Sequence, residues 1–552
     1  MQIGQIFKRV LGKAPDPFAV AMPATRAEPA LGAPGRNGQA GLAIDLPAAI
    51  RAHAVLVNGG EEVVVDDRYQ GHPELLSWLL VRQSDTGRRP AVTTASAREL
   101  AGHRDRAVAS AKEADEDAGL GTLRAARQLL TEAAKVCASD MHVLLREKFA
   151  EVQLRVKDDL SSIRTMNRSE GEALIRAACV GLASVKDAMY RPYEFQSAQI
   201  EGGSLPGSGL SSVRIIRGPA YPIEHGGGFM VARLQYGDMQ DLDENGKTEL
   251  VFTTPKRPEG TLALDARGYT PLQIEKLETL ASMPDGIVLI SGPTGSGKNT
   301  TLFDLMAHQA RIFPGARQIT IEDPVEYPME WAVQLPVTDA NDAKFAESLR
   351  TILRMNPNII LVGELRGVET ARTALAAALT GHMVWSTIHT NDPYLVIDRL
   401  EEMDRVELSR RVICDPNRIR GFVAQRLVPV LCPECSLPID ADKDLSHGRL
   451  ADALKTWGDS AGVRIKGPGC DRCRGDGVIG RRAVAEVVVA TEDLMADFVN
   501  VGTGAARVRH RARPGSDKSM LANCIDVVLR GLVDPRDAER KMGAIVAKGE
   551  GA

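Results

Sequence analysis

The residues with the clearest chemical potential form a glycine-rich loop between an apolar segment and a helical one. The stretch GIVLISGPTGSGK, residues 286–298, runs from apolar residues into the loop, and TTLFDLMAHQARIF continues with helical periodicity. In such loops, backbone N–H groups converge on phosphate oxygens, the helix adds its positive N-terminus, and a lysine neutralises the phosphates. We therefore predict a nucleotide site made of Gly292, Pro293, Thr294, Gly295, Ser296, Gly297, Lys298, Asn299 and Thr300.

One position of this loop departs from the usual pattern. The lysine is normally followed by Ser or Thr, whose hydroxyl holds Mg²⁺, whereas this chain has Asn299. Asparagine offers a neutral carbonyl oxygen on a longer stem, with an NH₂ group that has to be turned away. We predict that Mg²⁺ binding is weakened but retained. The alternative is a nucleotide-binding scaffold with impaired hydrolysis.

Three later apolar segments end in polar residues, as parallel strands do when they deliver side chains to one edge of a sheet. QITIEDPVEY carries Glu326, NIILVGELR presents Glu364, and GHMVWSTIHT has His382 and His389 on either side of its strand. A carboxylate at the end of a buried strand can hold a metal ion or its water ligands. For the two histidines, packing or helix capping is the alternative to catalysis.

Four of the eight cysteines form two C-x-x-C pairs, which are Cys432 with Cys435 and Cys470 with Cys473. Each pair places two thiolates on one tight turn, and two such turns complete a tetrahedral S₄ site that suits Zn²⁺. The alternative is a redox dithiol, although neither pair opens a helix after a βα turn. We predict a structural zinc site.

The ordered set of SGPTGSGK, TIEDPVEY, IILVGE, GH and TIHT closely resembles the secretion ATPases of type II secretion and type IV pilus assembly. The resemblance covers roughly residues 135–545. It implies that Lys298 lies in the Walker A box, that Glu326 positions the attacking water, and that Glu364 is the Walker B acid. It also implies ATP and Mg²⁺ as cofactors and assigns the two histidines to the His box of the family.

Two arginines match places where the family carries arginines that reach toward the γ phosphate, namely Arg155 in EVQLRVK and Arg214 in SSVRII. Solvated arginines on strands are the alternative, because KDD follows Val156 where the family usually reads DG. ASDMHV similarly lacks the acidic-Pro pair that follows it in the family. The cysteine region resembles the metal-binding subdomain that assembly and secretion ATPases carry and retraction ATPases lack.

The elements around these residues predict an α/β protein of several domains, because 552 residues exceed what one core usually holds. Together with the resemblance, they predict a RecA-like P-loop motor domain with an inserted zinc subdomain, preceded by a PAS-like α/β domain and a small divergent N-terminal domain. The expected ranges are 1–43 for an amphipathic segment and Pro/Ala/Gly-rich tether, 44–130 for the small domain, 131–255 for the PAS-like domain, and 264–552 for the ATPase domain, with the zinc subdomain at about 430–480.

Several local elements are predicted upstream of the loop. AVLVNGGEEVVV indicates two strands about a turn at Asn58, and HPELLSWLLVRQ indicates a helix. A helical stretch then leads to a hairpin of MHVLLR and EVQLRV, a long helix near 168–190, and strands at SSVRII and GFMVARL. Residues 1–13 have helical spacing of apolar residues and form either a docking helix or a frayed end.

Composition limits the partners and the compartment. The 68 basic and 72 acidic residues give a net charge of -4, so no global field favours nucleic acid or an anionic membrane. Sparse cysteines and the lack of a long apolar run or cleavable signal predict a cytoplasmic protein. The resemblance implies a homo-hexamer, peripherally associated with the inner membrane through a platform protein, that builds a pilus or pseudopilus. The alternatives are a conjugative or thin-pilus ATPase and a nucleic-acid translocase, although no nucleic acid is expected as partner.

Overall fold

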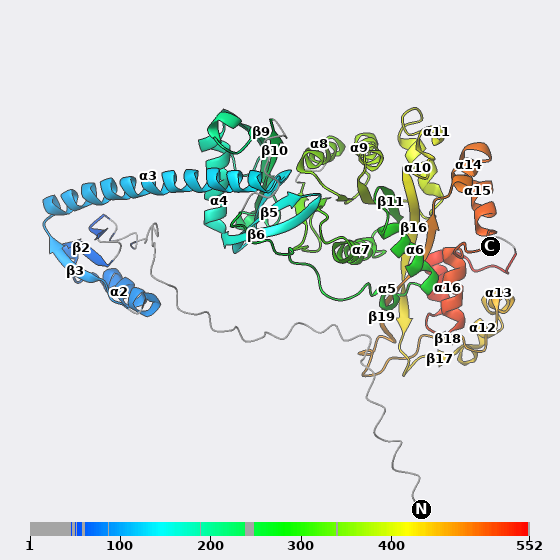
Figure 1. The fold of residues 1–552 in the computed structure, drawn as a ribbon. Coiled ribbons are helices and arrows are strands. Elements are labelled where there is room, and N and C mark those ends of the chain that lie inside the picture. The colour runs from blue at the N-terminus through cyan, green and yellow to red at the C-terminus, as the bar shows by residue number, and fades with distance from the viewer. Residues whose placement is uncertain are drawn as a thin grey trace, which may run out of the picture. The chain divides into compact units, whose positions relative to one another are not determined.

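The computed structural model describes residues 46, 50, 52–57, 61–86, 88–187, 189–237, 248–337 and 341–549. The chain divides into two compact units, Met1–Gln128 and Leu129–Ala552, and each is described by itself. Figure 1 shows the helices and strands in chain order. The segment 1–13, predicted to form a docking helix or a frayed end, lies outside the described residues.

The first unit contains a three-stranded sheet in the order β1-β2-β3. The first two strands are antiparallel, as predicted for the hairpin, and the third is parallel to the second. The helix between the second and third strands covers the sheet with Leu75 and Leu79, which pack with Val63 and Val65. The elements are β1 Ala54–Val57, β2 Glu62–Asp66, α2 Pro73–Thr86, β3 Ala91–Ala95 and α3 Ala97–Lys135, the last of which continues into the second unit.

The second unit begins with a seven-stranded antiparallel sheet in the order β6-β5-β4-β10-β9-β8-β7. The hairpin of β4 with β5 and the strands at SSVRII and GFMVARL are confirmed. The helix predicted near 168–190 is present but shorter than predicted. The α-helix ends at Arg176, and after a π-helical turn Val185 pairs with Gln199, because pairing at the sheet edge overrides helical periodicity. The elements are β4 Asp140–Leu145, β5 Phe149–Val156, β6 Asp159–Asn167, α4 Arg168–Arg176, β7 Val185–Lys186, β8 Gln196–Glu201, β9 Leu210–Pro219 and β10 Gly228–Tyr236.

The same unit continues into a second seven-stranded sheet, in the order β13-β12-β14-β15-β11-β16-β19. Every neighbouring pair is parallel except β16 with β19. The carboxyl ends of the parallel strands therefore meet at one edge, which is where ligands bind in such sheets. The strands are β11 Gly286–Ser291, β12 Gln318–Glu322, β13 Val333–Pro336, β14 Ile359–Val362, β15 Met383–Ile388, β16 Ile419–Leu431 and β19 Val478–Val489.

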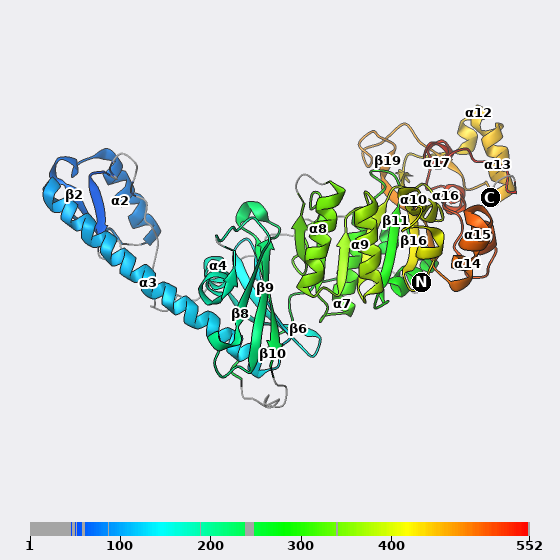
Figure 2. The same ribbon diagram turned by 90° about the horizontal axis from the view of Figure 1, so that it is seen from above.

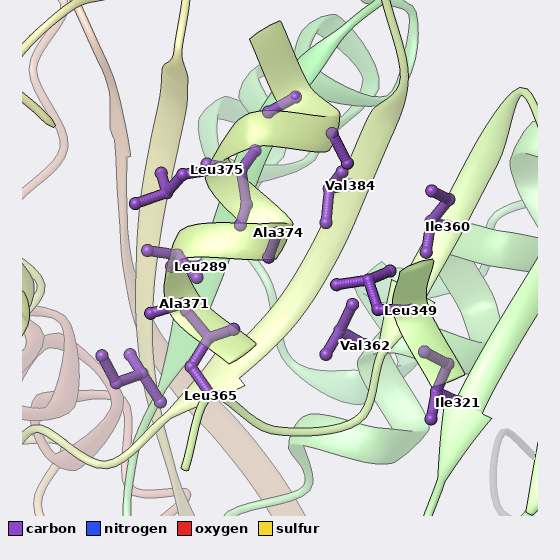
Figure 3. Packing of buried hydrophobic residues seen from close by; sticks show 14 of the residues in the cluster. Leu289, Ile321, Leu349, Ile360, Val362, Leu365, Ala371, Ala374, Leu375 and Val384 are labelled. Atoms are coloured by element: carbon purple, nitrogen blue, oxygen red, sulfur yellow. The ribbon is translucent and has the colours of Figure 1, made fainter. Parts of the chain in front are cut away.

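Helices cover both faces of this parallel sheet (Figure 2). Val288 and Ile290 of β11 pack with α6 and α7, whereas Ile287 and Leu289 pack on the opposite face with α8, α9 and α10. Burial on both faces explains why these strands are almost wholly apolar. Figure 3 shows Leu349 of α8 and Ala371, Ala374 and Leu375 of α9 packed among Leu289, Ile321, Ile360, Val362 and Val384. The helices are α6 Pro271–Ala281, α7 Lys298–Ile312, α8 Asp342–Ile352, α9 Val368–Leu379 and α10 Leu395–Met403.

The remaining elements include the region of the two C-x-x-C pairs and a helical C-terminal part. A small core joins α13 and α16 to Val428 of β16 and Val484 of β19. Among the described residues, no helix combines the length and apolar character that crossing a bilayer requires. These elements are α5 Leu264–Arg267, α11 Arg410–Ile413, β17 Leu437–Pro438, α12 Lys443–Ser446, α13 Arg449–Trp457, β18 Arg464–Ile465, α14 Glu492–Asn500, α15 Gly502–Arg511, α16 Met520–Leu529 and α17 Pro535–Met542.

Candidate active site and metal centre

The glycine-rich loop lies at the carboxyl end of β11, the strand between β15 and β16. Gly292 has φ 144° and Gly297, which precedes α7, has φ 85°. A Cβ at Gly292 would lie 2.3 Å from the carbonyl oxygen of Gln425, so only glycine fits there. The loop thus turns tightly enough to present its backbone N–H groups and the N-terminus of α7 to a phosphate, as the sequence predicts.

Lys298 is buried at the start of α7, and its ammonium group is held by the loop. Its Nζ donates to the carbonyl oxygens of Gly292, at 2.8 Å, and Pro293, at 3.1 Å. Burial lowers the pKa of Lys298, while the nearby carboxylates of Glu364 and Glu326 act in the opposite direction. The structure therefore brings these three predicted residues into one electrostatic site.

Glu364 follows β14, and its carboxylate is held by two side chains, those of His389 and Arg366. His389 Nε2 lies 3.2 Å from Glu364 Oε1, and Arg366 Nε lies 3.4 Å from Glu364 Oε2. Arg366 also reaches Asp323, with Nη1 at 3.2 Å from Oδ2. The predicted pair of Glu364 and His389 thus meets at the edge that carries the phosphate loop. Arg366 was missed as a site residue, although its place directly after the strand of Glu364 was a usable signal.

Glu326 is exposed on the loop after β12. The next residue, Tyr327, packs this loop against α7. The Tyr327 hydroxyl lies 2.9 Å from Thr300 Oγ1, and the rings of Tyr327 and Phe303 have centroids 5.4 Å apart. Glu322 has a different role, because its carboxylate accepts hydrogen bonds from Thr320 and Gln334. Glu326 is therefore the carboxylate of this loop that remains available for a water molecule.

His382 lies at the opposite edge of the sheet from His389. It precedes β15, and the backbone N–H of Gly286, at the start of β11, donates to its carbonyl oxygen. The six residues of β15 span about 20 Å at roughly 3.3 Å per residue. The ring Nδ1 of His382 lies 3.0 Å from the carbonyl oxygen of Ala377, at the end of α9. The structure therefore separates the two histidines and fits the capping alternative for His382.

Arg155 is also far from the phosphate loop and is buried between the antiparallel sheet and the parallel sheet. Its Nη2 donates to the carbonyl oxygen of Asn356 at 3.1 Å and to Asn358 Oδ1 at 2.9 Å, and its Nη1 donates to the carbonyl oxygen of Asp158. Asn358 directly precedes β14, so this contact lies at the amino edge of the parallel sheet. Arg214 is exposed on β9. A catalytic role for either arginine stays a prediction.

Substitution of Arg155 should show whether its role is structural. We expect Arg155→Ala to lower the free energy of unfolding by about 2–4 kcal/mol, because it removes a buried side chain and the three hydrogen bonds that it donates. Arg214→Ala is the matched control, with an expected change within about 0.5 kcal/mol. Thermal unfolding followed by circular dichroism measures both. An Arg155→Ala variant as stable as the parent but unable to hydrolyse ATP would instead support the catalytic role.

The four predicted cysteines gather into one cluster, and their Sγ atoms all lie within 4.8 Å of one another. Cys432 and Cys470 are 3.6 Å apart, and Cys435 and Cys473 are 3.8 Å apart. Four thiolates placed tetrahedrally at about 2.3 Å from Zn²⁺ would lie about 3.8 Å from one another. The cluster therefore fits a closed tetrahedral zinc site.

Backbone N–H groups around the cluster stabilise the thiolate form of Cys473. Burial would raise the pKa of Cys473, but the N–H groups of Cys470 and Gly477 each donate to its Sγ at 3.1 Å and lower it to about 6. A Cβ at Gly467 would lie 1.6 Å from the carbonyl oxygen of Cys435, so the close approach of the two turns requires glycine there. Thiolate donors held in this way are typical of structural zinc sites.

A parallel sheet that carries a phosphate loop, with carboxylates following neighbouring strands, defines a P-loop ATPase. Residues 245–540 match the profile of the family described as Type II/IV secretion system protein. The chain belongs to this family and is one of its ATPases.

Three curated relatives support this assignment. The putative type II secretion system protein E of Escherichia coli (strain K12) is 32% identical over 392 residues, which cover 69% of each chain. The type II secretion system ATPase E of Vibrio cholerae is 30% identical over 435 residues, covering 78% of this chain and 76% of the relative. The type IV pilus assembly ATPase PilB of Thermus thermophilus is 31% identical over 431 residues, covering 77% of this chain and 43% of the relative.

Proposed function

We propose that this chain is a hexameric ATP-hydrolysing motor that drives assembly of a type IV pilus or a type II secretion pseudopilus at the inner membrane. The observation that carries the hydrolytic part is that Lys298, Glu326 and Glu364 follow the carboxyl ends of three parallel strands, β11, β12 and β14, of one sheet. The type of work is inferred from the printed names of the relatives, which describe type II secretion and pilus assembly.

In the proposed reaction, the loop N–H groups and Lys298 bind the β and γ phosphates of ATP, and Glu326 orients a water molecule for attack on the γ phosphorus. The bond from that phosphorus to the oxygen bridging the β phosphate breaks as the bond to the water oxygen forms, and Glu326 accepts the proton. Glu364 is held by His389 and Arg366, so it can orient the metal ligands without rotating away. A bound Mg²⁺ would neutralise the charge that develops on the phosphate oxygens.

The zinc site has a structural role in this proposal. Cys432, Cys435, Cys470 and Cys473 would hold one Zn²⁺, and a closed four-thiolate site has no position for a substrate. The metal would tie the end of β16 to the turn that precedes β19. We further propose a cytoplasmic protein that binds an inner-membrane platform protein, with residues 1–13 as the candidate docking helix.

The Asn299 position provides the test that separates a working motor from a scaffold. Among the described residues, no hydrogen bond holds the Asn299 side chain, so its carbonyl oxygen is able to turn toward a metal ion. We expect the parent chain to hydrolyse ATP, and Asn299→Thr to reach half-maximal activity at lower Mg²⁺ and to turn over up to about tenfold faster, which corresponds to about 1.4 kcal/mol.

The comparison is a Mg²⁺ titration of phosphate release by the parent and Asn299→Thr, with Asn341→Thr as the matched control. Asn341 caps α8 through the backbone N–H of Lys344 and lies outside the phosphate loop. Threonine also caps helices, so this control should leave the Mg²⁺ requirement unchanged. A parent chain that binds ATP without hydrolysing it, combined with turnover by Asn299→Thr, would establish the scaffold alternative.

A further inference from the structure

A cavity of about 170 Å³ lies beside β19, where the start of α6 approaches α16. One water molecule needs about 10–15 Å³ of such space, so the cavity has room for a ligand of several non-hydrogen atoms. One wall is formed by Tyr269, which precedes α6, and by Gln273 of α6. The other walls include Arg482 of β19, Asn523 of α16 and Arg530, which directly follows α16. None of these residues belongs to the phosphate loop or the cysteine cluster.

The inner wall of the cavity is rigid, because its buried amides already have their partners. Gln273 Nε2 donates to the carbonyl oxygen of Ala485 at 2.8 Å and to Asp517 Oδ2 at 2.9 Å. Asn523 Nδ2 donates to the same carbonyl oxygen at 2.9 Å. These bonds tie α6 and α16 to the edge strand β19, so the cavity is a preformed feature of the fold.

The charged side chains of the cavity leave positive charge without a counter-ion. Arg482 donates from Nη2 to the carbonyl oxygen of Gly268, but its Nε is buried and has no partner. In the part of the chain that the structure describes, the Arg530 side chain has neither a hydrogen bond nor an ion pair. Asp526 also lines the cavity, and its carboxylate is paired with Lys518.

We propose that this cavity binds a small phosphate-bearing ligand, held by Arg482 and Arg530. Guanidinium groups bind phosphate through paired N–H donors, and Arg482 and Arg530 both line the cavity. A bound phosphate would also relieve the repulsion between the two guanidinium groups. Burial lowers the pKa of Arg482, and the positive charge of Arg530 lowers it further. The two arginines therefore act as ligand-binding residues outside the hydrolytic site.

The cavity shares a hydrogen-bonded wall with the phosphate loop. The Tyr269 hydroxyl lies 3.1 Å from Thr301 Oγ1 on α7 and donates to Gln425 Oε1 at 2.6 Å. Gln425 Nε2 in turn donates to the carbonyl oxygen of Ser296, within the loop, at 2.8 Å. Ligand in the cavity and nucleotide in the loop can therefore influence each other's affinity, so a binding test must keep the two sites apart.

The test is calorimetric titration of the full chain with inorganic phosphate, with the loop first saturated by ADP and Mg²⁺. We expect one saturable phosphate site per chain under these conditions. Arg482→Gln and Arg530→Gln should each weaken phosphate binding about tenfold or more. Arg399→Gln, an exposed position on α10, is the matched control and should leave it unchanged.

Arg530 is exposed at the end of α16, so its variant keeps the fold even if Arg482→Gln does not. Circular dichroism of each variant checks this directly. Two results would overturn the proposal: no saturable phosphate binding to the ADP-saturated chain, or parental affinity in a folded Arg530→Gln variant.

Discussion

Lys298→Ala is expected to abolish ATP hydrolysis, with a fall in turnover of roughly 10²–10³-fold or more, because it removes the cation that we propose to bind the β and γ phosphates. The substitution should leave the chain folded. Burial already lowers the pKa of Lys298, so its charged form incurs a desolvation cost that alanine removes. Phosphate release at saturating ATP and Mg²⁺ measures the effect.

Lys455→Ala is the matched control for this prediction. Lys455 lies on α13, where its side chain is 58% exposed and pairs with Asp452. Exposed ion pairs of this kind contribute little to stability, so turnover should equal that of the parent. A Lys298→Ala variant that keeps most of the parental rate would show that the loop is not the hydrolytic site.

The second large effect is expected for Cys432→Ser, which removes one of the four thiolates. Zinc content should fall from about one equivalent per chain to near zero. Structural zinc in small peptides contributes about 10–16 kcal/mol of binding free energy at neutral pH, so the region between β16 and β19 should lose its order. Elemental analysis measures the metal, and limited proteolysis with mass spectrometry locates the opened segment.

Cys414→Ser is the matched control for the zinc prediction. Cys414 lies outside the four-cysteine cluster, so it is not a candidate metal ligand. Its substitution should keep zinc at the parental level. If Cys432→Ser and the parent chain contained equal zinc, the four-cysteine assignment would be refuted.

The phosphate loop could be predicted from sequence because its chemistry needs neighbouring residues. The glycines and Lys298 are contiguous, and a tight turn with backbone donors has few other sequence solutions. The cysteine cluster was predictable for a similar reason, since each C-x-x-C pair fixes two ligands on one turn. In both cases neighbouring residues determine the local geometry of the site, and the rest of the fold only brings these short segments together.

The positions that could not be predicted depend on strand direction and on contacts between distant segments. His382 and His389 are close in sequence, but they lie at opposite ends of β15 and therefore at opposite edges of the sheet. Arg155 has its partners at Asn356 and Asn358, and no sequence pattern links these positions. The strand order, with β11 between β15 and β16, likewise depends on packing and not on chain order.

The most direct test of the proposed motor function is Mg²⁺-dependent ATP turnover measured on the oligomer itself. The full chain would be incubated with nucleotide, its mass determined by light scattering during size-exclusion chromatography, and phosphate release assayed in each mass fraction. We expect a hexamer that hydrolyses ATP only when Mg²⁺ is present. A chain that stays monomeric at all nucleotide conditions, or a hexamer that binds ATP without releasing phosphate, would contradict it.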